Sequence, residues 1–390
     1  MQTILNPDNQ SIVIVGGGPV GLVLAIAMQQ HGLPVKVLEA RQQGAAYHDK
    51  RALALSYGSK MILEQLGVWT AVLPHVTPID CIHVSQKGSL GRAKLLASEH
   101  QLPALGYVVA YGALMQALDG VLNSADVLYE AVATAITQNN EFADVDFTLA
   151  GDLHRLATDL LVIAEGGRSL ENIASLKRDT KAYGHDALVS KVRCELPHNH
   201  IAYERFTTTG PMALLPNGDH DFSLVWTGEQ SSIDRLLALD DATFLAELHA
   251  TFGDRVGRFL SVEKRMSFPL MKSQLENKQT PHMAVIGNSA QTMHPVAGQG
   301  FNVGMRDATV LMQQLLATPQ SDWGSINMLA TYAKARVRDT KGGLLFTDFL
   351  VTVFSNDVIG LSGMRSLGLG LLDSCSPVKN ILVNKMSYGK

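Results

Sequence analysis

Several features that would assign the chain to common functional classes are missing from its sequence. It has three cysteines, Cys81, Cys194 and Cys375, and none forms a CxxC pair, which excludes a thioredoxin-like dithiol and predicts no metal site of the zinc-knuckle kind. The net charge of −4 gives no basic excess, so nucleic acid is not an expected partner. The N-terminal residues lack the basic region of a secretory signal. These absences favour a cytoplasmic globular protein, and the length of 390 residues allows two to three domain-sized units.

Uninterrupted hydrophobic runs of membrane-spanning length are also missing. The apolar run at residues 11–27 contains a glycine-rich motif, and polar or charged residues interrupt the run at 342–372. Neither run therefore predicts a membrane span. The apolar stretch at residues 344–354 favours a core helix.

Strand and helix signals alternate at the start of the chain. Residues 11–15 read as a buried strand, 19–31 as a helix and 34–39 as a second strand, which is the pattern of a parallel βαβ unit. Short strands separated by turn residues then predict a largely antiparallel sheet, at 187–194, 200–206, 212–215 and 222–226. The sequence therefore predicts an α/β fold with a Rossmann-like parallel sheet, an inserted β-sheet domain and C-terminal helices.

The change in pattern along the chain gives a division into domains. We assign residues 1–80, 100–182 and 270–340 to a discontinuous dinucleotide-binding domain, because the buried-strand pattern returns at 283–287 and a helix begins near Gly300. The β-sheet substrate domain comprises residues 81–99 and 183–269. Residues 341–390 form a C-terminal helical segment.

The six residues after the first strand read GGGPVG, which matches GxGxxG. In such a motif Gly16 permits the tight turn, Gly18 lets a pyrophosphate approach the backbone, and Gly21 lets the helix pack close to the sheet. Val20 lies in the first turn of that helix, whose N–H groups and positive dipole end attract phosphate. Glu39 ends the second strand and is placed to accept from ribose hydroxyls, which disfavours a ribose 2′-phosphate. A dinucleotide is predicted, either FAD or NAD.

A second glycine-rich segment lies at residues 287–307 and reads GNSAQTMHPVAGQGFNVGMRD. It follows an apolar strand, and Gly298-Gln299-Gly300 opens a helix whose N–H groups suit an electron-rich, partly anionic ring edge. A second nucleotide contact this far along the chain favours a long ligand, which is FAD.

This segment resembles the second FAD motif of the single-component flavin aromatic hydroxylases, which share the para-hydroxybenzoate hydroxylase fold. Asn288 stands where that family usually has Asp against the ribityl chain, and an Asn side chain can still hydrogen-bond a ribityl hydroxyl. Gln291 stands where His is common, and Glu165 replaces the Asp of the family's middle motif. The resemblance implies FAD contacts at Glu165, Asn288, Pro295, Gly298, Gln299, Gly300, Phe301 and Asn302, with Pro295 beside the flavin ring.

Narrower features resemble the ubiquinone-biosynthesis hydroxylases. The segment KRALALS at residues 50–56 is similar to that branch's Arg-Ala-x-Ala-Leu segment, which implies that Arg51 lies over the FAD. Residues 204–216 and 223–226 resemble the same branch, and Arg205, Pro216 and Trp226 are expected on its substrate pocket. The Asn288 and Gln291 variant is most similar to the 2-polyprenyl-6-methoxyphenol hydroxylases.

The resemblance implies a reaction and its partners. NAD(P)H, a transient co-substrate, reduces FAD, O₂ adds at flavin C4a, and the hydroperoxide oxygen is inserted into the ring of a polyprenylated methoxyphenol in ubiquinone biosynthesis. The absence of a second complete GxGxxG agrees with a nicotinamide that binds only transiently. The expected partners are a lipophilic prenylphenol and O₂, with other ubiquinone-biosynthesis proteins as candidates. A prenyl tail would need an apolar tunnel or a membrane-facing mouth, so residues 344–354 could line that tunnel or touch lipid instead of forming a core helix. Membrane contact would then be peripheral, at the inner membrane face. His294 is near the flavin motif, but no general base is assigned.

Two alternatives stay open. One is a related flavin oxidoreductase that acts on another prenylated phenol or quinone; a halogenase is disfavoured because Trp226 lacks the second Trp of a WxWxIP motif. The other is a flavin-binding scaffold or assembly protein of a quinone-biosynthesis complex, which would fit the departures at Asn288, at Glu165 and at Asn172, where the family usually has Arg.

Overall fold

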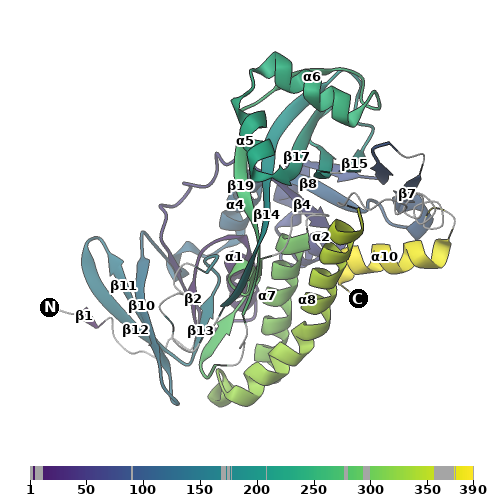
Figure 1. Cartoon of the computed structure of the whole chain (residues 1–390). Helices are drawn as coiled ribbons and strands as arrows, with labels where there is room; N and C mark the ends of the chain where they lie inside the picture. Colours follow the sequence, from purple (N-terminus) through teal and green to yellow (C-terminus); the bar gives the residue numbers. More distant parts are fainter. Residues whose placement is uncertain are drawn as a thin grey trace.

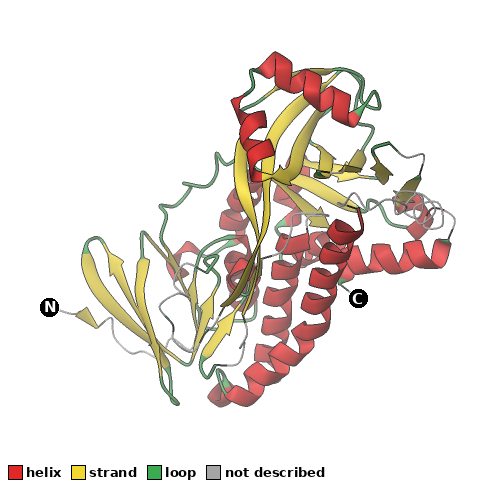
Figure 2. Ribbon diagram, in the orientation of Figure 1, coloured by secondary structure: helices red, strands yellow, loops and turns green. Residues whose placement is uncertain are grey.

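A computed structural model of the chain describes residues 3–4, 12–88, 91–167, 173, 176, 178–207, 209–275, 280–292, 299–354, 373 and 375–389 (Figure 1). Within these residues two large sheets organise the chain, one parallel and one mostly antiparallel. Figure 2 shows the helices gathered beside the parallel sheet and over the outer end of the larger one. The expected α/β fold class is confirmed.

The parallel sheet carries the predicted βαβ unit. All four strand pairings are parallel, and the order is β20 (Met283–Val285), β13 (Leu160–Ile163), β2 (Ile12–Val15), β3 (Lys36–Glu39) and β9 (Val127–Tyr129). Ile12 and Ile14 point into a core shared with three helices: α1 (Pro19–Gln30), α4 (Tyr111–Val121) and α7 (Gln299–Ala317). Because parallel strands end at the same edge, the turns after β2, β3, β13 and β20 lie near one another.

The other face of the parallel sheet is covered by a small β meander that the sequence analysis missed. Val13 and Val15 of β2 pack against Val145 and Phe147 in a second buried cluster. The meander consists of β10 (Val132–Gln138), β11 (Ala143–Leu149) and β12 (Asp152–Thr158), with β1 (Thr3–Ile4) alongside β12.

The larger sheet has nine strands and contains the predicted β-rich insert. Its order is β21 (Gln291–Thr292), β19 (Met266–Leu275), β14 (Arg178–Cys194), β17 (Asp221–Glu229), β16 (Gly210–Pro216), β15 (Ile201–Thr207), β6 (Cys81–Gln86) and β7 (Arg92–Leu96), and β18 (Phe259–Val262) pairs with β14. The β15–β6 pairing is the parallel one among the strand pairs of this sheet in the described residues. Through it, β6 and β7 join the same sheet as the insert. Helices α5 (Gln230–Ala238) and α6 (Asp241–Phe252) cover one face of this sheet.

Alternation along the strands decides which side chains this cover buries. On β17, Phe222, Leu224 and Trp226 lie in the cluster beneath α5 and α6, together with Leu188 of β14. Successive side chains of a strand point to opposite faces. The alternate residues of β17, such as Ser223 and Val225, therefore face away from these helices.

The remaining elements connect the two sheets. A three-stranded sheet of β4 (Ala52–Ser56), β8 (Gly106–Ala110) and β5 (Val76–Ile79) lies next to α2 (Tyr57–Gln65) and α3 (Trp69–Val72). The long helix α8 (Ile326–Phe354) packs on α7, and α10 (Ser376–Tyr388) reaches α2, where Ser56 Oγ donates to the carbonyl of Ser387. Short 3-10 turns complete the chain: η1 (Leu73–His75), η2 (Ala97–His100), η3 (Ser124–Asp126), η5 (Gly287–Ser289) and η7 (Gln320–Asp322).

Four of the proposed domain boundaries fall inside single elements, and the one between residues 99 and 100 lies in η2. Residues 182 and 183 both belong to β14, and residues 269 and 270 both belong to β19, so these two long strands run from the parallel-sheet region into the larger sheet. Helix α8 passes through residue 341. None of the helices, over the described part of the chain, is both long and apolar enough to cross a membrane. The side chains of residues 344–354 lie outside the described residues, so their role stays a prediction.

Candidate active site

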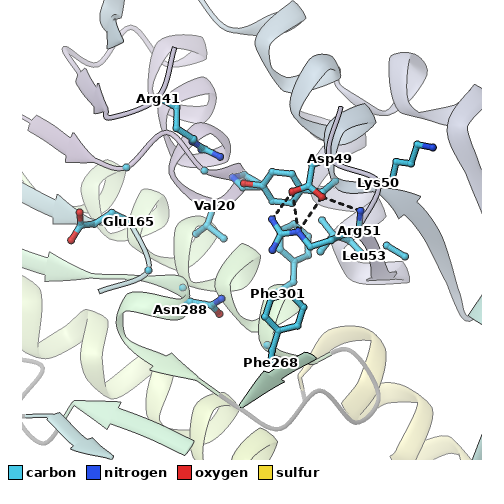
Figure 3. Close-up of a pocket in the computed structure, with 18 of the residues that line it drawn as sticks. Val20, Arg41, Asp49, Lys50, Arg51, Leu53, Glu165, Phe268, Asn288 and Phe301 are labelled. Atoms are coloured by element: carbon cyan, nitrogen blue, oxygen red, sulfur yellow. Dashed lines mark hydrogen bonds and ion pairs between the residues drawn. The ribbon is translucent and has the colours of Figure 1, made fainter. Parts of the chain in front are cut away.

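One cavity joins the glycine turn to the uncovered face of the larger sheet (Figure 3). Its volume is about 750 Å³, which is within the range of sites for small molecules and cofactors. At one end the lining residues include Gly16, Gly18, Glu39 and Arg51, and at the other they include Val189, Ser223, Val225 and Met266. The sequence placed these two ends in different domains, and the fold brings them together.

The glycine turn is shaped by close contacts on both sides of Gly18. A Cβ on Gly16, which has φ +111°, would lie 2.6 Å from the backbone nitrogen of Glu165, and a Cβ on Gly21 would lie 2.1 Å from the carbonyl oxygen of Gly16. A Cβ on Gly18 would meet nothing nearer than Tyr111 Oη at 4.0 Å. Gly16 and Gly21 are therefore required by packing, whereas Gly18 leaves space at the start of α1, where no side chain caps the helix. That space beside N–H groups fits a pyrophosphate.

Glu39 lies at the end of β3, as the sequence predicted, and is nearly buried. Its carboxylate accepts from the N–H of Gly17 at 2.7 Å and from the backbone N–H and Nε of Arg41 at 2.9 and 2.7 Å. Burial raises the pKa of this carboxyl, but the hydrogen bonds and charge of Arg41 and the bond from Gly17 outweigh it, so the pKa lies below its ordinary value. The carboxylate is thus ionised beside the glycine turn. Arg41, which the sequence analysis missed, stands two residues after it and also lines the cavity.

A Glu39→Gln variant should lose a pH-dependent part of its stability. Because folding lowers the pKa of Glu39 from its ordinary 4.5, the contribution is fully present above that value and is lost as pH falls through the lower folded pKa. Urea unfolding of both proteins between pH 7 and pH 3 should show a stability difference that shrinks below about pH 4.5. A difference that stays constant over this range would contradict the assignment. Glu64→Gln, which removes an exposed carboxylate, is the matched control.

Arg51 forms part of the cavity wall opposite Gly18. Asp49 accepts from its Nε at 2.9 Å and from its Nη2 at 2.5 Å, and its guanidinium carbon lies 5.1 Å from the centre of the Tyr111 ring. Figure 3 shows the dashed contacts between Arg51 and Asp49 on the cavity wall. These partners hold a cation where a ligand's phosphate or ring can reach it. The FAD contact of Arg51 itself stays a prediction.

The described part of the second motif is anchored by Asp307. Its Oδ2 accepts from the N–H of Gly287 at 3.0 Å and from Nε2 of Gln291 at 2.7 Å, and its Oδ1 accepts from Nε of Arg336 at 2.6 Å. Gln291, the departure from the family's His, is therefore a buried structural partner. Asn288, between these anchored residues, is exposed to the cavity.

Asn302 is buried and its amide is used in contacts within the protein. Its Oδ1 accepts from Ser56 N–H at 2.8 Å and from Ser59 Oγ at 2.7 Å, and its Nδ2 donates to the carbonyl of Ala54 at 2.9 Å. The side chain thus fixes the start of α7 to β4 and α2. Any contact of Asn302 with a cofactor would be made by its main chain.

The other predicted cofactor residues are placed as follows. Val20, Glu165, Gly300 and Phe301 line the cavity together with Asn288. Val20 also packs between Gly287 and Gly304. Pro295, Gly298 and His294 lie outside the described residues, as does the side chain of Gln299. Their flavin contacts therefore stay predictions.

The predicted substrate-pocket residues lie outside the lining of this cavity, and their contact with a substrate stays a prediction. None of Arg205, Pro216 and Trp226 lines the cavity, because all three lie on the helix-covered face of the larger sheet. Trp226 is buried 6.2 Å from the ring of Phe244, Arg205 Nε donates to the carbonyl of Thr251 on α6, and Pro216 pairs with the core residue Phe222. The neighbours of opposite parity, Leu215 and Val225, line the cavity instead.

Comparisons with known proteins agree with this site. The family described as FAD binding domain matches residues 9–342. The chain is 35% identical to the ubiquinone hydroxylase UbiL of Rhodospirillum rubrum, over 95% of this chain and 88% of that one, and 30% identical to the 3-demethoxyubiquinol 3-hydroxylase of Escherichia coli, over 92% and 93%. The crystal structure of p-nitrophenol 4-monooxygenase PnpA from Pseudomonas putida has a TM-score of 0.77 at 15% identity, covering 99% of this chain and 98% of that one.

The glycine turn and the family match together define a flavoprotein whose cofactor is FAD. The chain belongs to the FAD-binding monooxygenase family, and within it to the aromatic hydroxylases. The solved structure, at 15% identity, shows that the fold is shared and nothing finer.

Proposed function

We propose that this enzyme inserts one oxygen atom of O₂ into the ring of a polyprenylated methoxyphenol during ubiquinone biosynthesis. The observation that carries the proposal is that one continuous cavity runs from the FAD-binding glycine turn to an apolar wall on the larger sheet. Val189, Val225, Met266 and Phe268 contribute this wall. The names of the two bacterial relatives support the pathway.

Bound FAD supplies the chemistry of accepting a hydride from NAD(P)H and activating O₂. The chain supplies the placement: Gly18 and the start of α1 hold the pyrophosphate, and the wall of β14, β17 and β19 holds the aromatic ring. Met266 and Phe268 are 38% and 42% exposed although both are large and apolar. Covering these two side chains with a ring and the start of a prenyl tail would remove apolar surface from water and exclude water from the reacting ring.

The substrate also bears on where the enzyme works. A polyprenyl tail partitions into lipid, so peripheral contact with the inner face of the membrane from the cytoplasm is part of the proposal. Other ubiquinone-biosynthesis proteins are candidate partners for transfer of such a substrate.

The test combines genetics with an assay of the purified protein. Deleting the gene should accumulate a prenylated phenol that lacks one ring oxygen, identified by mass, and purified enzyme with NAD(P)H and ¹⁸O₂ should return one ¹⁸O atom to it. An accumulated precursor already oxygenated at that ring position would overturn the assignment. If the FAD stays oxidised with NADPH and with every prenylphenol tried, the flavin-binding scaffold alternative is supported instead.

A further inference from the structure

The cavity wall formed by the larger sheet is divided into rows by strand register. Leu215, Ser223 and Lys191 are in-register neighbours on β16, β17 and β14, and all three line the cavity. The next row consists of Ala213, Val225, Val189 and Met266, and it carries no polar side chain. The wall therefore has an apolar part and one edge where a hydroxyl and a cation stand side by side.

Ser223 presents a hydroxyl group in a nearly closed environment. The residue is 8% exposed, and its Oγ accepts from Nδ2 of Asn217 at 2.8 Å. A hydroxyl both accepts and donates, so this bond fixes the oxygen and leaves the hydrogen available to a ligand. Asn217 thereby positions Ser223 as a donor.

Lys191 lies beside Ser223 on the neighbouring strand. Its Nζ is 3.1 Å from Asp221 Oδ2, and its side chain is 33% exposed. An ammonium group has three donors, and Asp221 occupies one of them. The other charged groups at this edge are Arg193, which also contacts Asp221, and Glu263 and Lys264 on the chain after β18.

We propose that Ser223 and Lys191 form the seat for the phenolic oxygen of the substrate, a proposal that rests on the proposed function above. A buried hydroxyl donor next to a cation selects an oxygen that accepts hydrogen bonds and can carry negative charge. The apolar row holds the ring. These two groups would therefore bind a free phenol more tightly than its O-alkyl ether.

The seat has a consequence for the pH dependence of the reaction. A cation next to the phenolic oxygen favours the ionised form and so lowers the pKa of the bound phenol. A phenolate ring is richer in electrons than a neutral phenol ring and reacts faster with an electrophilic oxygen. Without Lys191, higher pH is needed to reach the same fraction of bound phenolate.

The test compares two probes, 2-geranyl-6-methoxyphenol and its O-methyl ether, in five proteins: wild type, S223A, K191M, K191R and R193M. Wild type should prefer the phenol. S223A should lower kcat/KM for the phenol roughly tenfold, and K191M should lower it roughly 10- to 100-fold and move the acidic limb of its pH profile upward. K191R should restore part of the loss. R193M is the matched control, because Arg193 shares Asp221 but does not line the cavity.

The possible outcomes separate the two proposals. Turnover of neither probe by wild type contradicts the proposed function and the seat with it. Turnover with the same phenol-to-ether ratio and the same pH profile in all five proteins contradicts the seat alone, and so does a loss in R193M as large as in K191M. FAD content and Tm are measured first. If S223A does not fold, the Lys191 variants, which change a partly exposed side chain, decide the outcome.

Discussion

A Gly21→Ala variant will lose its FAD during gel filtration, although its sequence differs by one methyl group. The added Cβ would lie 2.1 Å from the carbonyl oxygen of Gly16 and 3.4 Å from Cβ of Ala164, so α1 must move away from β2 and the β13 turn. Overpacking of this kind costs about 3 kcal/mol at the upper end of its usual range. If the apoprotein avoids this cost by letting α1 move and the FAD-bound state cannot, FAD binds roughly a hundredfold more weakly. Titration of the apoprotein with FAD, followed by flavin fluorescence, measures the change.

The matched control for this variant is Gly120→Ala. Gly120 also lies in a helix, α4, and a Cβ there would meet no atom within 4 Å. Alanine in a helix interior is more favourable than glycine by roughly 0.5–1 kcal/mol. Gly120→Ala should therefore keep its FAD and unfold at an equal or higher temperature. If Gly21→Ala binds FAD as tightly as Gly120→Ala does, the close packing of α1 does not shape the FAD site.

The parallel sheet and the glycine turn could be predicted from sequence because their signals are local. The apolar strand that ends at Val15, the glycines that follow it and the acid at Glu39 all lie within about thirty residues, and each has one physical role in a βαβ unit. The meander of β10 to β12 was missed because only β11 (ADVDFTL) alternates strictly between apolar and polar residues, and none of the three strands carries a motif. It becomes recognisable only as the layer that covers Val13 and Val15.

The residues of the larger sheet that line the cavity could not be assigned from sequence, because the register decides which alternate side chains of a strand face it. Trp226 and Val225 are adjacent, and the sequence does not say which of the two faces α5 and α6 and which faces the cavity. Choosing residues by type favoured Trp226, whose size suits a core equally well. The roles of Gln291 and Asn302 were hidden for a similar reason, since their partners Asp307 and Ser56 come together only in the fold.

The second large effect is expected at Asp307, which connects Gly287 and Gln291 to Arg336 on α8. The residue is 2% exposed and takes three hydrogen bonds, from Gly287, Gln291 and Arg336. Arg336, itself 4% exposed, also lies 2.8 Å from Asp339 Oδ2, but that oxygen accepts from Arg306 Nε at 2.6 Å as well, so two carboxylates balance two arginines. Removing one of two partners leaves part of a buried charge uncompensated.

An Asp307→Asn variant should therefore lose about 3–5 kcal/mol of unfolding free energy, the range for breaking a buried pair, because the remaining carboxylate, Asp339, is shared with Arg306. Urea unfolding measures the loss, and Glu247→Gln, which breaks the exposed pair with Arg235, should cost less than about 1 kcal/mol. The double variant D307N/R336M removes the stranded cation, so it should be more stable than the sum of the single losses predicts. Strict additivity would mean that the charge of Arg336 is not what Asp307 stabilises. Because Asp307 also fixes the N–H of Gly287, next to Asn288 on the cavity, D307N should weaken FAD binding even at temperatures where the protein stays folded.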